Sequence, residues 1–256
     1  MNKYNQYLQV FNNNSLNEKT DKLGYQEDWE IILAGYLLEN NIDLKRHKDD
    51  LHYLDFYFQN GTDNIHIEAV APTAGNANNK VKEVPVINKL SEQMDFESGI
   101  RDDDKILARF TNCIVNKIRQ ANTKNIPNTD SIILAINTDK ILGSWESSEE
   151  MPIILRCLYG ISAPFITRDG AMGYTYCDEL TKKDSTSKIK LGYFKEHLFP
   201  FSGIICSGIT KDKINYSGIS SKDFIYYQNP LKPDLRNVFA KMMTIDDTNF
   251  QQKSTD

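Results

Sequence analysis

Several features that often point directly to a function are missing from this sequence of 256 residues. It holds four cysteines, none in a C-x-x-C pair, which argues against a zinc site and against a disulfide framework. No apolar run reaches the ~20 residues that span a bilayer, and the first residues lack the apolar core and cleavage site of a signal peptide. We therefore expect a cytoplasmic protein with reduced cysteines and no membrane partner.

Other absences narrow the chemistry. The sequence contains no G-x-S-x-G, H-E-x-x-H, P-loop or dinucleotide-binding fingerprint. Its net charge of −5 supplies no overall attraction toward nucleic acid, so such a partner would be held by local basic surface or through a divalent cation. With 25% charged and 40% hydrophobic residues, the composition is that of an ordinary globular protein.

The length suits one large domain. We expect a polar N-terminal extension over residues 1–24, a single α/β domain over residues 25–245 and a disordered polar tail over residues 246–256. Residues 75–97 are rich in Asn and contain Pro85, which predicts a long surface loop.

The spacing of apolar residues predicts the main elements. Helices are expected over residues 27–41, 102–122 and 152–160, and strands over residues 131–138, 201–208 and 224–230. In the second helix, acidic residues open the first turn. Its apolar face is formed by Leu107, Phe110, Ile114, Ile118 and Ala121.

Residues 51–59 and 64–72 predict a β-hairpin, because both are rich in aromatic and β-branched residues and Asn60-Gly61 is a turn signal between them. A two-residue turn at Asn60-Gly61 would pair Asp55 with His66 and leave Glu68 diagonally across from Asp55, roughly 7 Å away on the same face. A four-residue loop would place the two acids directly opposite. An odd loop would separate them onto opposite faces, so shared chemistry requires an even loop.

Asp55 and Glu68 are the best candidates for chemistry. Both have apolar neighbours in sequence, so they belong to strands that are expected to be buried. Two carboxylates that converge there repel each other, and a bound Mg²⁺ or a raised pKa relieves the repulsion. One alternative is that one of the acids simply faces solvent. Another is that the pair serves as general acid and base on a glycoside, although no aromatic sugar platform is evident.

The order of these elements resembles the PD-(D/E)XK nuclease superfamily over roughly residues 26–138. A helix bears an acid, Glu30, a hairpin carries Asp55 and then Glu68, and a helix and a further strand follow. The resemblance implies a restriction-endonuclease-like three-layer α/β/α fold with a central mixed sheet. It implies that Asp55, Glu68 and Glu30 bind Mg²⁺ or Mn²⁺, and that water attacks a phosphodiester of nucleic acid. A homodimer is compatible with this expectation.

The sequence departs from the family at two positions. Val70 stands where the family motif has Lys, and Leu54 stands where it has Pro. In some members the Lys comes from the following helix, and Lys117 is placed for that role. If the missing Lys reflects lost catalysis, the chain would instead be an inactive binding or regulatory module with the same fold.

Arg109, Asn116 and Gln120 share a polar stripe with Lys117. We expect these side chains to point at one place, where Lys117 and Arg109 would stabilise charge and Gln120 would orient a nucleotide or water. The alternative is an amphipathic helix with a solvated polar side.

His66 and the basic stretch at residues 181–195 are further candidates for substrate binding. His66 shares the predicted face with the acids. In the basic stretch, Lys188 and Lys190 precede Tyr193 and Phe194, and lysines beside aromatic residues can contact phosphates and stack bases. A solvated loop and strand is the alternative.

A second resemblance, to a poorly characterised bacterial group, supports the fold more than an activity. It rests on the E-A-x-x-P-x-x-G stretch that begins at Glu68, the R-x-T-x-x-I-x-x-K pattern from Arg109 to Lys117, and Asn229-Pro230.

Overall fold

The computed structural model describes residues 2–16, 24–47, 53–75, 103–141, 152–166, 172–181 and 188–244, together with residues 168, 170 and 186. The expected surface loop lies outside these residues except for Gly75, and the expected tail at 246–256 lies wholly outside them.

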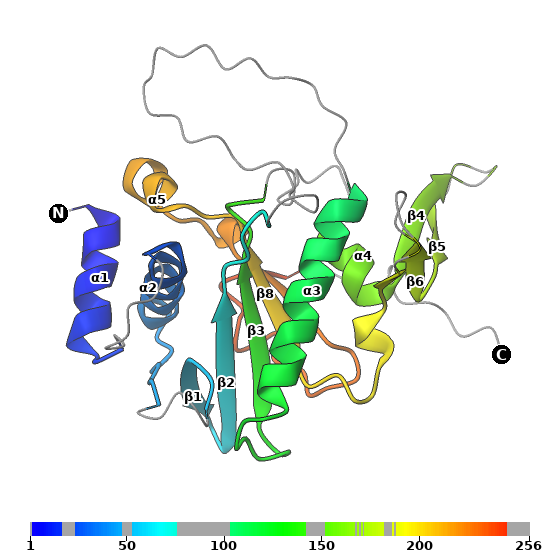
Figure 1. The fold of residues 1–256 in the computed structure, drawn as a ribbon. Coiled ribbons are helices and arrows are strands. Elements are labelled where there is room, and N and C mark those ends of the chain that lie inside the picture. Colours follow the sequence, from blue (N-terminus) through cyan, green and yellow to red (C-terminus); the bar gives the residue numbers. More distant parts are fainter. Residues whose placement is uncertain are drawn as a thin grey trace, which may run out of the picture.

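In the described residues, five α-helices accompany a central mixed sheet of six strands, which confirms the expected α/β class (Figure 1). The helices are α1 (Lys3–Asn13), α2 (Gly24–Glu39), α3 (Asp103–Ala121), α4 (Ile153–Tyr159) and α5 (Lys211–Ser217). The strands of the central sheet are β1 (Phe56–Asn60), β2 (Asp63–Val70), β3 (Ser131–Asn137), β8 (Gly203–Ser207), β9 (Ile225–Gln228) and β10 (Met243–Thr244). Two small hairpins pair β4 (Ile161–Ile166) with β5 (Met172–Tyr176), and β6 (Glu179–Thr181) with β7 (Lys188–Lys190).

The central sheet has the strand order β1-β2-β3-β8-β9-β10. Strands β2, β3 and β8 are parallel, whereas β1 and β9 run antiparallel to their neighbours β2 and β8. Helix α3 makes the crossover from β2 to β3, because parallel neighbours cannot be joined by a tight turn. The predicted helices and strands from residue 102 to residue 230 correspond to α3, β3, α4, β8 and β9.

Helices cover both faces of the sheet and bury two apolar cores (Figure 1). Leu134 and Ile136 of β3 belong to the core beneath α3 and α4. Ile133 and Ala135 alternate with them and belong to the core that includes α1 and α2. All residues of β3 are buried, because a central parallel strand is covered on both faces.

Helix α1 falls within the segment that the sequence analysis treats as a polar extension. Its Tyr4, Tyr7 and Phe11 are spaced at three and four residues and are buried against the rest of the chain. The ring of Tyr7 lies over Gly35 of α2, where an added Cβ would be 2.2 Å from the ring. Gly35 therefore permits the close approach of α1 to α2.

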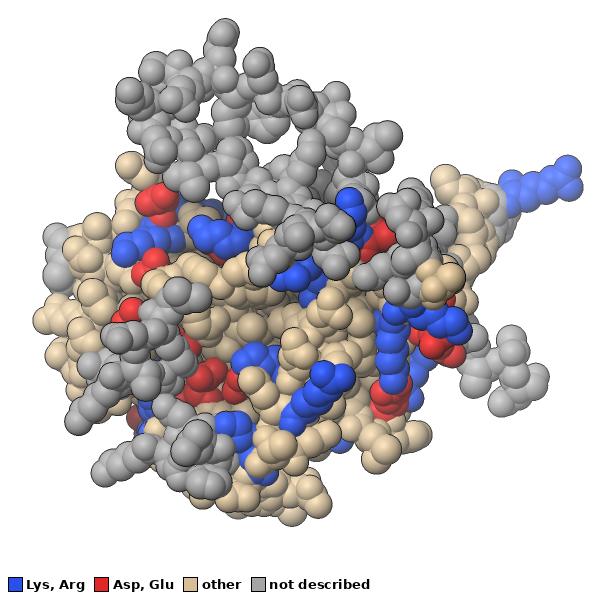
Figure 2. Space-filling model, viewed as in Figure 1, with Lys and Arg blue, Asp and Glu red and all other residues tan. Residues whose placement is uncertain are grey.

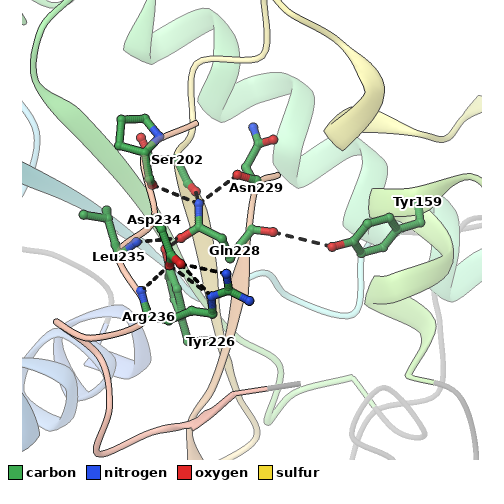
Figure 3. A network of polar contacts seen from close by, with 9 residues as sticks. Tyr159, Ser202, Tyr226, Gln228, Asn229, Asp234, Leu235 and Arg236 are labelled. Atoms are coloured by element: carbon green, nitrogen blue, oxygen red, sulfur yellow. Dashed lines mark hydrogen bonds and ion pairs between the residues drawn. The ribbon is translucent and has the colours of Figure 1, made fainter. Parts of the chain in front are cut away.

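Gln228, at the end of β9, organises the chain that follows it (Figure 3). Its Oε1 accepts from the Tyr226 hydroxyl at 2.8 Å and the Leu235 amide at 2.9 Å. Its Nε2 donates to the carbonyls of Ser202, Asn229 and Pro233. Each polar atom of this buried side chain is thus satisfied.

Asn229 has a similar role in the same turn. Its Nδ2 donates to the carbonyl of Phe201 at 2.9 Å, and its Oδ1 accepts from the amide of Leu231 at 3.0 Å. The Asn229-Pro230 signature noted in the sequence is therefore part of a structural turn.

Cys113, Cys157 and Cys206 are buried, whereas Cys177 is half-buried, and all four are free thiols in the structure. Burial raises the pKa of each of the three buried thiols to about 12, which favours the protonated form at neutral pH. Among the described residues, no helix combines the length and the apolar character needed to cross a membrane.

Candidate functional site

The hairpin that carries the acidic pair forms, but its register differs from the predicted one. Asn60 pairs with Asp63 and Tyr57 pairs with His66, so the predicted pairing of Asp55 with His66 is wrong. The turn consists of Gly61 and Thr62, and Gly61 has a φ of +63°.

The physical reason for this shift is the position of the glycine. A type I′ turn at Asn60-Gly61 needs positive φ at both residues, whereas only Gly61 among the turn residues has it. With Gly61 as the first turn residue, as in a type II′ turn, the turn lies one residue later in the chain than predicted. It still contains two residues, an even number. Continued by one residue beyond the pair of Phe56 with Ile67, this register sets Asp55 opposite Glu68 on the same face.

Asp55 lies one residue before β1, and its side chain accepts a hydrogen bond from a backbone amide of β2. Its Oδ2 accepts from the amide of Ala69 at 2.8 Å. Because Ala69 follows Glu68 directly, this bond fixes the Asp55 carboxylate beside Glu68. The Oδ1 atom of Asp55 lies 3.8 Å from the guanidinium of Arg46.

Glu68 on β2 is 7% exposed, and its Oε1 accepts a hydrogen bond from the ammonium of Lys117 on α3. Burial raises the pKa of Glu68, and the charge of Asp55 raises it further. Lys117 and Lys124 act in the opposite direction. The structure therefore brings together Asp55 from the residue before β1, Glu68 from β2 and Lys117 from α3.

Glu30 lies on α2, at the opposite face of the sheet from Lys117, and is held by two side chains. Its Oε2 accepts from both terminal nitrogens of Arg46, each at 3.2 Å. Its Oε1 accepts from Gln26 at 3.0 Å. The side chain of Gln26 also bonds the carbonyl of Ala69 and the amide of Ala71, which fastens α2 to the end of β2.

Glu30, Arg46, Asp55, Glu68 and Lys117 thus form a chain of charges that crosses the sheet where β1 begins. Three carboxylates and two basic groups make up this cluster, and the charge of Lys124 also acts on Glu68. In the part of the chain that the structure describes, no group of three or more His, Cys, Asp or Glu side chains is arranged to hold a metal ion.

Two carboxylates are nevertheless a donor set that suits Mg²⁺. This ion commonly keeps several waters and takes one or two protein carboxylates together with phosphate oxygens. Asp55 and Glu68 supply two such carboxylates, and the charge of Asp55 adds to the effect of burial in raising the pKa of Glu68. Both oxygens of Glu30 accept hydrogen bonds from neighbouring side chains, and the two oxygens of Asp55 face the Ala69 amide and Arg46.

The other residues predicted on α3 do not gather at this pair. The guanidinium of Arg109 donates to the carbonyl of Thr73 at 2.6 and 3.1 Å, so it anchors the segment after β2. Asn116 and Gln120 are exposed on α3, and among the described contacts neither side chain bonds Glu68 or Lys117.

His66 occupies the Glu68 face of β2, two residues earlier, and forms a polar cluster of its own. Its Nε2 lies 2.9 Å from Asp130 Oδ2, and its ring stacks parallel to His47 with centroids 5.6 Å apart. His66 is 5% exposed, and its buried Nδ1 has no hydrogen-bond partner among the residues that the structure describes.

Two lysines in the described part of the predicted basic stretch pair with acids, whereas residues 182–185 and 187 lie outside the described residues. Lys188 pairs with Glu179, and Lys190 pairs with Glu196. Tyr193 and Phe194 are each 1% exposed, so they are core residues and cannot stack on bases. Figure 2 shows the same mixture over a wider area, since blue and red side chains are interspersed on the face viewed.

Sequence reasoning missed Gln26, Arg46 and Asp130. No local spacing rule predicts their contacts, because Arg46 bonds Glu30 across 16 residues and Asp130 meets His66 across 64. Only the polar character of Gln26, one helical turn before Glu30, was a local signal.

Comparison of the chain with protein-family models, with curated proteins and with solved structures finds no match. The class of the protein therefore rests on its own fold and site: an α/β protein with a paired, lysine-contacted acidic cluster at the end of a hairpin.

Proposed function

We propose that this protein is a divergent PD-(D/E)XK nuclease with a restriction-endonuclease-like fold, which hydrolyses phosphodiester bonds of nucleic acid with Mg²⁺ or Mn²⁺. The proposal is carried by one observation. Asp55, fixed on the Ala69 amide, and Lys117, bonded to Glu68, converge on the end of β2 from two different elements.

The order of helices and strands along the chain supports the same proposal. An acid-bearing helix (α2), a hairpin with Asp before Glu (β1 and β2), a helix (α3) and a parallel strand (β3) follow one another as the resemblance requires. Helices on both faces of a mixed sheet agree with the three-layer architecture (Figure 1).

In the proposed reaction, the oxygen of a water molecule bonds to phosphorus, a bridging P–O bond breaks, and the leaving oxygen takes up a proton. Asp55 and Glu68 are the residues that would hold a divalent ion. When bound, such an ion neutralises charge on the phosphate and generates a nucleophile from water at neutral pH.

Lys117 stabilises the charge that develops on the phosphate. Its ammonium has three donors, and one of them already holds Glu68 Oε1. The remaining donors are available for a phosphoryl oxygen next to the ion, and at 17% side-chain exposure the group is partly shielded from water. Lys117 would thus take the role of the Lys in the family motif, whose position is occupied here by Val70.

A second candidate, an inactive binding or regulatory module, is favoured by a different observation. Arg46 beside Asp55 and Lys117 on Glu68 already provide positive charge, so the acidic cluster is compatible with a stable fold that never binds a metal. In either case we place the protein in the cytoplasm, where free cysteines stay reduced.

Incubation with supercoiled plasmid, single-stranded DNA and RNA distinguishes an active nuclease from an inactive binding module. We expect cutting of at least one substrate with Mg²⁺ or Mn²⁺, none with EDTA, and none by Glu68→Ala. A matched control is Glu196→Ala, which removes an acid from a distant, exposed ion pair and should cut at the full rate. Binding of nucleic acid without cutting by the wild-type protein would favour the inactive module.

A further inference from the structure

The segment that follows helix α1 contacts the acidic cluster directly. Leu16, three residues after the end of α1, is fully buried. Its carbonyl accepts a hydrogen bond of 2.6 Å from a terminal nitrogen of Arg46. The same guanidinium donates to Glu30 and lies 3.8 Å from Asp55. The end of the N-terminal helix is therefore one hydrogen bond away from the arginine of the acidic cluster.

Aromatic rings make a second connection between α1 and this cluster. The ring of Phe11 on α1 meets the ring of Phe56 on β1 edge to face, with centroids 6.4 Å apart. Phe56 follows Asp55 directly in the sequence, and its ring centroid lies 5.2 Å from the guanidinium of Arg46. A backbone carbonyl and an aromatic ring thus both join α1 to the surroundings of the Asp55 carboxylate.

Helix α1 depends on tertiary contacts for its own stability. An isolated helix of 11 residues is marginal in water. In the structure, the Tyr7 ring lies over Gly35 of α2, and the hydroxyls of Tyr4 and Tyr7 donate to Asp28 and Glu39 (Figure 1). Because α1 contributes no strand to the sheet, it can leave α2 without separating any pair of strands.

We propose that α1 is a strap over the buried side of the acidic cluster. Its docking on α2 fixes Arg46, and through Arg46 it fixes the carboxylate of Asp55 on the amide of Ala69. This inference concerns a conformational device in the fold and is independent of nuclease activity.

The burial of Arg46 explains how undocking reaches Asp55. The Arg46 side chain is 5% exposed, so the Leu16 carbonyl and its surroundings shield the guanidinium from water. Withdrawal of this carbonyl admits water, which raises the local dielectric constant and competes for the guanidinium donors. The interaction of Arg46 with Asp55 weakens as a result, and the Asp55 carboxylate is held less firmly beside β2.

Tyr7→Ala tests this strap in the full chain. The substitution removes the ring that lies over Gly35 and leaves every residue of the acidic cluster unchanged. The readouts are the NMR chemical shift and the hydrogen exchange of the Ala69 amide, which donates to Asp55. We expect a shift of this amide, and exchange about tenfold or more faster relative to the amide of buried Ile133, which reports global unfolding.

The nuclear Overhauser contact between the Phe11 and Phe56 rings shows whether α1 is docked in each variant. The matched control is Val10→Ala, because Val10 is a 36% exposed residue of the same helix. This control should keep the ring contact and the wild-type Ala69 amide. Loss of the ring contact in Tyr7→Ala with an unchanged Ala69 amide would overturn the inference.

If Tyr7→Ala does not fold, hydrogen exchange of the wild type in low concentrations of urea decides. We expect the amides of α1 and the amide of Ala69 to exchange through one shared opening, at a lower free energy than the Ile133 amide. Exchange of α1 and Ala69 through separate openings would contradict the strap.

Discussion

The ammonium of Lys117 donates a hydrogen bond to Oε1 of Glu68, joining helix α3 to strand β2 at a buried position. This contact connects the helical layer that contains α3 to the acidic pair on the sheet. It also means that the basic group proposed to stabilise a phosphate is already oriented by the acid that is proposed to hold the ion.

Lys117→Met is expected to lower the cleavage rate about 10²- to 10³-fold, because a preorganised donor to the developing charge is lost. The measurement is the single-turnover rate on whichever nucleic acid the wild type cuts. Lys124→Met is the matched control: Lys124 influences Glu68 only through its charge, so this variant should lose far less. Equal losses in both variants would mean that Lys117 acts only through general electrostatics.

The pH dependence of activity follows from Glu68. Burial first, and the charge of Asp55 second, raise its pKa above the ordinary value of 4.5. Because an ion binds the carboxylate and not the carboxylic acid, cleavage and Mn²⁺ affinity should fall as pH drops through this raised pKa. Asp55→Asn should lower the pKa of Glu68, which carboxyl ¹³C chemical shifts would report. If the pKa of Glu68 were the same in Asp55→Asn as in the wild type, the charge of Asp55 would have no effect on Glu68, which would contradict the account.

The same shift affects stability. Between pH 4.5 and the raised value, the folded state retains the Glu68 proton that the unfolded state releases. The contribution of Glu68 to the free energy of unfolding therefore falls as pH rises through this window. Urea unfolding at a series of pH values should show this slope in the wild type and its loss in Glu68→Gln. Identical slopes would argue that Glu68 is not buried as described.

Local sequence patterns were enough to predict the hairpin, helices α2, α3 and α4, and the shared face of Asp55 and Glu68. They were enough because alternation, helical spacing and turn residues act over a few positions. The predicted turn was one residue too early. The turn begins at Gly61, which has a positive φ, and not at Asn60.

Long-range contacts were beyond the reach of those patterns. Arg46 lies in the chain between α2 and β1, and its pairing with Glu30 and Asp55 depends on how the helix packs on the sheet. Helix α1 was missed for another reason: its apolar stripe is made of aromatic residues in a largely polar segment, and it is stabilised by α2 rather than by its own composition.

Gly35→Ala tests whether α1 packs on α2 in solution. The added Cβ would be 2.2 Å from the Tyr7 ring, so the helices must separate, at a cost of about 2 kcal/mol in the free energy of unfolding. Gly24→Ala is the matched control, because nothing lies within 4 Å of the position of its added Cβ. Equal stability of the two variants in urea unfolding would contradict the packing of α1.

Gln228→Met should destabilise the chain by about 3 kcal/mol, because three carbonyls, one amide and the Tyr226 hydroxyl lose their partner at a buried position (Figure 3). Tyr226→Phe removes only one of these bonds and should cost about 1 kcal/mol. Both are measured by denaturant unfolding. A neutral Gln228→Met would show that the turn after β9 is held by other contacts.

The central claim is that Asp55 and Glu68 act as one site, and a double-variant cycle of cleavage rates tests it most directly. The wild type, Asp55→Asn, Glu68→Gln and the double variant are compared on one nucleic-acid substrate with Mg²⁺. Residues that act as a unit are strongly non-additive, so we expect each single variant to lose about 10³-fold or more and the double variant to lose no more than either. Full activity in either single variant, or losses that multiply in the double variant, would contradict the account.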